Sequence, residues 1–217
     1  MLENKKHIFW QALIITITIF IFGMVIGIYF EQIRTDNVNT LFYNSESELF
    51  DTISFLSITD LFNVSCDELV KLNIAFADKV YTQALEVDKI DTSNQATDSL
   101  KAIHRKYDVL RTILWINILN LKKQCPNVND IVYLYIYHTE DHQVKSQEIV
   151  MSRLLSDLKQ KRGNDFILIP IATNSDINSL DYILNQYNIT DIPTIFINEK
   201  YKITNPQSIT EIEKYLN

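Results

Sequence analysis

The sequence predicts an α/β protein that follows a membrane-spanning helix and a helical region. Three observations lead to this prediction: an uncharged apolar run near the N-terminus, a middle region with helically spaced apolar residues, and a C-terminal part in which short apolar runs alternate with amphipathic stretches. The boundaries that we expect are 1–7 for a cytoplasmic tail, 8–30 for the span, 31–46 for a juxtamembrane linker, 47–126 for the helical region and 127–217 for the α/β domain.

The expected span is 23 residues long, from Ile8 to Phe30, and carries no charge. At a rise of 1.5 Å per residue this length is about 35 Å, enough to cross a bilayer core. The run shows neither the polar face of a soluble helix nor a small-residue cleavage site before Glu31. It therefore predicts an uncleaved signal anchor, with the membrane as a partner.

The charges that flank the span predict its orientation. Lys5 and Lys6 precede it, whereas Arg34 is the basic residue that follows closely. Because positive residues stay on the cytoplasmic side, we expect a single-pass protein with a cytoplasmic N-terminus and the bulk of the chain extracytoplasmic.

The composition argues against two classes of ligand. The formal net charge is −7, and nucleic-acid binding needs clustered basic residues. The chain has only three glycines, two of them in the span, so a glycine-rich phosphate loop is absent. We expect no nucleic-acid partner and no cofactor.

The middle of the chain predicts three helices. The first covers about 47–60, and the second begins at the capping box Ser65–Glu68 and runs to about Val87. After the polar stretch Asp88–Asn94, the third helix runs from about Gln95 to Gln124. Two long helices joined by a short polar turn favour an antiparallel hairpin.

Such a hairpin would bring Cys66 and Cys125, at its two outer ends, side by side. In an oxidising compartment a structural disulfide is expected there. Two alternatives stay open, namely free thiols if the topology is inverted and an exchangeable redox pair. A disulfide held between two long helices would be a poor exchange site, because attack on sulfur requires access.

The third helix also carries a near-heptad apolar stripe. Such a stripe permits a homodimer through the helical region, although it is more often part of an internal core. Its members are Leu100, Ile103, Tyr107, Leu110, Leu114 and Leu121.

After Pro126 the hydrophobic period changes to that of an α/β domain. The expected order is strand–helix–strand–helix–strand–strand–helix, with the first two strands parallel because a helix connects them. The expected ranges are 131–137, 147–161, 166–171, 177–187, 192–197, 200–204 and 208–216.

Residues 187–196 carry the most specific pattern in the chain, Tyr-x-Ile-x-x-Ile-Pro-Thr-Ile-Phe. A proline belongs at the first residue of a strand because it cannot donate to the ladder. This segment resembles the cis-proline loop of the thioredoxin superfamily. The order of elements over 128–217 is similar to the βαβαββα fold of that family, so the resemblance implies a thioredoxin-like domain.

In redox members of that family a Cys-x-x-Cys motif lies at the start of the first helix. Here Asp141–Val144 would occupy those positions, and no cysteine lies within fifteen residues. We therefore expect no catalytic residue at this site. His138 and His142 lie in a predicted loop without a third ligand, so we expect no metal site.

The resemblance also implies a groove between two loops, in which backbone groups could pair with an extended peptide by β-augmentation. The residues expected to line it are Thr139, Glu140, Asp141, His142 and Val144 on one side and Ile192, Pro193 and Thr194 on the other.

The sequence thus favours a membrane-anchored, redox-inactive thioredoxin-like module that binds or scaffolds a peptide or protein on the extracytoplasmic side. Two alternatives remain: a thiol–disulfide protein that uses Cys66 and Cys125, and a structural membrane protein that dimerises through the helical region.

Overall fold

The computed structural model describes residues 3–58, 65–90 and 98–216, which form two compact units, 1–43 and 44–217. Helix α1 (Glu3–Ile58) is continuous for 56 residues. The segment 31–46, expected as a linker, is therefore helical, since no proline or glycine interrupts it. Residues Ile8–Ile33 are long and apolar enough to cross a membrane, with a mean hydropathy of 2.6.

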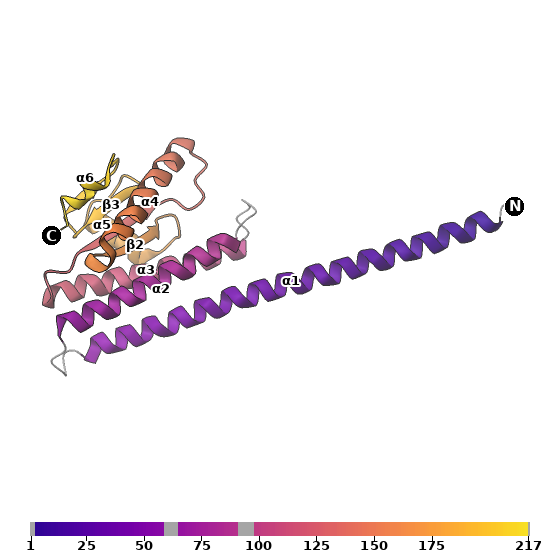
Figure 1. Ribbon diagram of the computed structural model, residues 1–217, viewed down its shortest axis with the longest axis horizontal. Helices are drawn as coiled ribbons and strands as arrows, with labels where there is room; N and C mark the ends of the chain where they lie inside the picture. Colours follow the sequence, from indigo (N-terminus) through magenta and orange to yellow (C-terminus); the bar gives the residue numbers. More distant parts are fainter. Residues whose placement is uncertain (1–2, 59–64, 91–97, 217) are drawn as a thin grey trace. The chain divides into compact units, whose positions relative to one another are not determined.

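Helices α2 (Cys66–Ile90) and α3 (Asp98–Gln124) lie side by side (Figure 1). The predicted cap of α2 is confirmed, because the backbone N–H of Glu68 donates to Ser65 Oγ at 3.3 Å. The Glu68 carboxylate accepts from the Ser65 hydroxyl, rather than from the backbone N–H that a full capping box would use. Most of the turn expected at 88–94 lies outside the described residues.

The C-terminal part contains a mixed sheet of four strands in the order β2-β1-β3-β4. Its strands are β1 (Asp130–Tyr135), β2 (Ile167–Ala172), β3 (Thr194–Ile197) and β4 (Tyr201–Ile203). β1 and β2 are parallel, as expected for a helical crossover, whereas β3 is antiparallel to both β1 and β4. This mixed α/β arrangement is consistent with a thioredoxin-like domain.

The connecting helices are α4 (His142–Arg162), α5 (Asn178–Gln186) and α6 (Ile209–Glu213), and a single 3-10 turn, η1 (Gly163–Asp165), follows α4. α4 begins five residues earlier than expected because Asp141 caps it, which apolar periodicity does not reveal. β3 begins two residues later than expected, directly after Pro193, which has no N–H to donate. The Ile192–Pro193 peptide bond is cis, as the family resemblance implies.

The two faces of the sheet have different coverings. On one face, α4 and α6 pack over a cluster that includes Ile131, Ile195 and Ile212. On the other face, α3 contributes Trp115, which is fully buried and has its ring centroid 6.2 Å from those of both Tyr187 and Phe196. α2 and α3 therefore belong to the hydrophobic core of residues 44–217, and the stripe of α3 is largely internal.

Candidate functional site

The two loops expected to form a groove leave the sheet at the same end. Leu134, near the end of β1, is paired in register with Thr194, the first residue of β3. The loop that follows β1 therefore begins close to the position at which the loop that precedes β3 ends. We call this region, residues 136–144 and 191–194, the loop end of the sheet.

The side chains at the loop end differ in exposure. Glu140, Asp141 and His142 are exposed, and Thr139, Val144 and Ile192 are half-buried. Pro193 and Thr194 are buried, and the Thr194 hydroxyl donates to the carbonyl oxygen of Asp191. A partner at this end would thus meet polar side chains of the first loop and the backbone of the second, not the Thr194 side chain.

The N-terminus of α4 is occupied by the protein's own carboxylate. Asp141 Oδ1 accepts from the backbone N–H groups of Gln143, at 2.8 Å, and Val144, at 3.3 Å. Thr139 Oγ1 in turn accepts from the Asp141 N–H at 3.2 Å. Helix amides at such a position can stabilise a thiolate, but here they stabilise an aspartate that has no thiol chemistry.

Helix α3 contacts the carboxyl end of β2, next to the loop end, through Asp108, which is almost completely buried. Its carboxylate accepts from the Ala172 N–H at 3.1 Å, the Ser175 hydroxyl at 2.7 Å and Arg111 Nη1 at 3.3 Å. Burial raises the pKa of Asp108, and the Arg111 charge partly opposes this shift. Sequence reasoning missed this residue. The signal was a second, polar stripe on α3, formed by His104, Asp108, Arg111 and Thr112.

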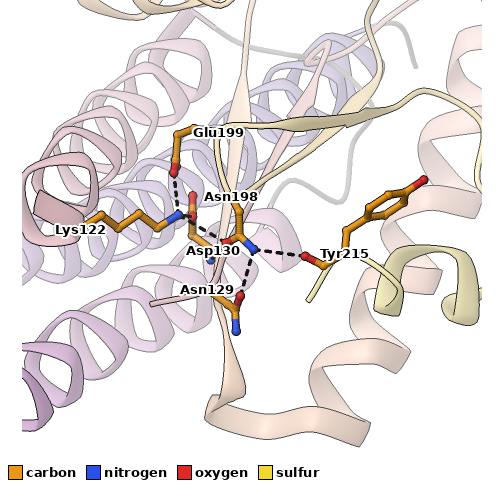
Figure 2. Close-up of polar contacts among 6 residues, drawn as sticks. All are labelled: Lys122, Asn129, Asp130, Asn198, Glu199 and Tyr215. Atoms are coloured by element: carbon orange, nitrogen blue, oxygen red, sulfur yellow. Dashed lines mark hydrogen bonds and ion pairs between the residues drawn. The ribbon is translucent and has the colours of Figure 1, made fainter. Parts of the chain in front are cut away.

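The opposite end of the sheet, at the amino ends of β1 and β2, contains a buried polar network (Figure 2). Lys122 of α3 donates to Asp130 of β1 and, at 2.6 Å, to Glu199 in the β3–β4 turn. Asn198 Oδ1 accepts from the Asp130 N–H at 3.0 Å, and its amide donates to Tyr215 O at 3.2 Å. We call this region the network end of the sheet.

The network end holds two carboxylates against one ammonium group. Asp130 is fully buried, and its pKa is raised to about 8, first by desolvation and then by the neighbouring Glu199 charge. Sequence reasoning treated residues 127–130 as a polar break before the strand. An aspartate directly before a continuous apolar run was the only signal, and it does not reveal Lys122 or Glu199 as partners.

The network end also carries the disulfide. Cys66 and Cys125 are bonded, with their Cα atoms 5.8 Å apart, so the predicted pairing is confirmed. The free-thiol alternative is wrong, since the two cysteines of the sequence are both in this bond. The disulfide therefore lies at the opposite end of the sheet from the loop end.

Three cavities lie outside the predicted groove. One of about 640 Å³ lies between α2, α4 and the β1–β2 edge, and one of about 460 Å³ lies near Arg105 and Tyr137. The third, of about 410 Å³, borders the disulfide. Residues 139–144 and 192–194 line none of these three, so the groove stays a prediction.

Comparisons with known proteins give little beyond the fold. No family model matches the chain, and no curated protein matches it. Among solved structures, the chain is similar to oxidised thioredoxin O2 from Arabidopsis thaliana, with 12% identity and a TM-score of 0.32. The match covers 46% of this chain and 82% of that protein.

Proposed function

We propose that this protein is a membrane-anchored binding module, with a thioredoxin-like domain on the extracytoplasmic side that is redox-inactive at its loop end. One observation carries the proposal: Asp141 occupies the N-terminus of α4, while both cysteines are bonded to each other at the network end. The loop end is then available for recognition rather than for thiol chemistry.

The membrane anchor is supported by the apolar surface of α1. Side chains along Ile8–Ile33 are exposed, and a surface of this length and hydropathy is unfavourable in water. The disulfide supports the orientation, because disulfides persist in oxidising compartments. Lys5 and Lys6 on the other side of the span favour the same topology.

The recognition surface is the loop end, and its charge indicates the kind of partner. Glu140 and Asp191 are exposed carboxylates in the two loops, and the exposed Asp141 contributes a third negative charge. Val144 and Ile192 are half-buried apolar residues beside them. An extended peptide that carries lysine or arginine next to an apolar residue fits this combination.

The test uses the full chain in detergent micelles and a displayed library of random peptides. Selected peptides should be enriched in lysine and arginine. Their affinity should fall about fivefold for Glu140→Lys, a loss of about 1 kcal/mol, because the substitution reverses a charge at the rim of the site.

The matched control is Asp157→Lys, the same change of charge at an exposed position about 24 Å further along α4. It should leave the affinity unchanged. Equal losses for the two variants, or a library that yields no bound peptide, would contradict the proposal.

A further inference from the structure

The two cysteine residues of the disulfide differ in their exposure to solvent. Cys66, the first residue of α2, is exposed, whereas Cys125 is 4% exposed. Thiol–disulfide exchange requires a thiolate to reach one particular sulfur. Because Cys66 is an exposed residue at the start of α2, we expect a partner thiolate to approach the disulfide from that side.

A cavity of about 410 Å³ borders the disulfide, and both cysteines line it. Its other walls come from the first turns of α2, from the segment that precedes β1 and from residues 164–167 before and at the start of β2. The rim of the cavity consists of exposed residues such as Lys71 and Asn127, and its floor includes the buried Phe166 and Ile167. A partner segment that enters the cavity thus reaches the disulfide without unfolding the helix pair.

Two carboxylates, those of Asp67 and Glu68, directly follow Cys66 in the first turn of α2. Of the charged residues that line the cavity, Asp165 is paired with Arg162 at 2.8 Å and Lys71 is a cation. Negative charge beside the reacting sulfur disfavours the approach of an anionic thiolate more than that of a zwitterionic one. The site therefore suits a thiol borne by a neutral or positively charged partner.

We propose that the Cys66–Cys125 disulfide is a thiol–disulfide exchange site, in which Cys66 forms the mixed disulfide with a neutral or cationic thiol. A partner thiolate attacks Cys66 Sγ, the bond between Cys66 and Cys125 breaks, and Cys125 leaves as a thiolate that takes up a proton. A second partner thiolate then attacks the partner sulfur and releases Cys66.

In this sequence the protein's disulfide is the oxidant. Two partner thiols become one partner disulfide, and Cys66 and Cys125 become two thiols. Cys125 is the resolving residue in the reverse direction, since it remains next to Cys66 at the end of α3. The activity lies at the network end and is independent of the peptide binding proposed for the loop end.

The first experiment treats the full-length protein in detergent micelles with cysteamine, followed by acid quenching, alkylation with maleimide and peptide mass mapping. Cysteamine should be found on Cys66 and maleimide on Cys125, with a preference of at least about tenfold. Equal distribution of cysteamine over both cysteines would overturn the proposal. So would a disulfide that reacts only after denaturant is added.

The second experiment compares two single variants. Cys125→Ser leaves Cys66 free, and Cys66→Ser leaves Cys125 free. Reaction with cystamine should be at least about tenfold faster for the first variant. For Cys125→Ser, cystamine should react about threefold faster than oxidised glutathione, and Asp67→Asn in that background should narrow this difference. Equal rates for the two cysteines would contradict the assignment, and the wild-type mapping stands if either variant fails to fold.

Discussion

The two ends of the sheet differ in the kind of interaction that holds the chain together. At the network end the chain is cross-linked by the Cys66–Cys125 disulfide and by the charges around Lys122. At the loop end, hydrogen bonds join Asn174 to the backbone of Tyr137, and the Asp108–Arg111 ion pair lies nearby. The disulfide and the ion pairs of Lys122 thus lie at the same end of the sheet. The loop end presents exposed polar side chains instead.

A second difference concerns the buried aspartate at each end. Asp108 accepts from a backbone amide, a hydroxyl and Arg111. Asp130 instead shares Lys122 with Glu199, and its Oδ2 atom has no hydrogen-bond partner within the described part of the chain. Desolvation raises the pKa of both residues, but only at Asp130 does a second carboxylate add to the shift. The carboxylate of Asp108 is therefore matched by one cation, whereas at the network end two carboxylates share the ammonium group of Lys122.

The largest effect should come from removal of the disulfide. The double variant Cys66→Ser, Cys125→Ser should lose about 4 kcal/mol of unfolding free energy, because the unfolded chain regains the freedom of a loop of 59 residues. Urea unfolding of the full chain in micelles measures this loss. Hydrogen exchange should rise more at residues 127–130, beside the lost cross-link, than at 136–141; an equal rise in both segments would show that the two ends are not distinct.

A smaller effect is expected at Asp108. The variant Asp108→Asn should lose about 3 kcal/mol, because the substitution removes the negative partner of the buried Asp108–Arg111 ion pair. The same unfolding assay measures the loss, with Asp157→Asn as the exposed control, which should stay within about 0.5 kcal/mol of the wild type. A loss below about 1 kcal/mol for Asp108→Asn would argue that the loop end does not depend on this carboxylate.

The smallest effect is a pH dependence at Asp130. Its pKa is about 8 in the folded protein, against an ordinary value of 3.8 for an aspartate in the unfolded chain. Between these two pH values the folded protein therefore binds more protons than the unfolded chain. The stability contributed by the protonated carboxyl is fully present below about pH 4 and is lost as the pH rises through about 8. Asp130→Asn should reduce the fall in stability between pH 5 and pH 9 by at least about 1 kcal/mol, since one pKa unit corresponds to about 1.4 kcal/mol. An identical pH profile for variant and wild type would contradict the role of Asp130.

Much of the local structure follows from the order of residues. The apolar run after Asp130 predicts β1, the Ser65 cap predicts the start of α2, and Pro193 predicts the beginning of a strand. Each of these signals acts within a few residues along the chain. The start of α4 was misplaced because the cap at Asp141 is polar and lies outside the apolar period on which the prediction depended.

The sites were less predictable than the elements. The sequence alone indicated which residues follow β1 and precede β3, but not that Thr194 turns inward or that Asp141 closes the N-terminus of α4. It also gave no reason to connect Lys122 with Glu199, which is 77 residues away. The exposure of Cys66 beside a cavity is likewise a property of packed surfaces, not of a motif.

The amino-acid sequence by itself specified the apolar span and the order of helices and strands, and it placed Cys66 and Cys125 at the two outer ends of a helical hairpin. The hydrophobic period, the helix caps and the effect of proline involve residues that are close together in the chain. They can therefore be recognised before the tertiary structure is known. Only the tertiary structure decided that α3 packs its apolar stripe against the sheet and that Asp108 and Asp130 are buried. It also decided that the disulfide lies opposite the loop end. These features depend on contacts between distant segments, whose free energy is set by desolvation and packing once the elements meet.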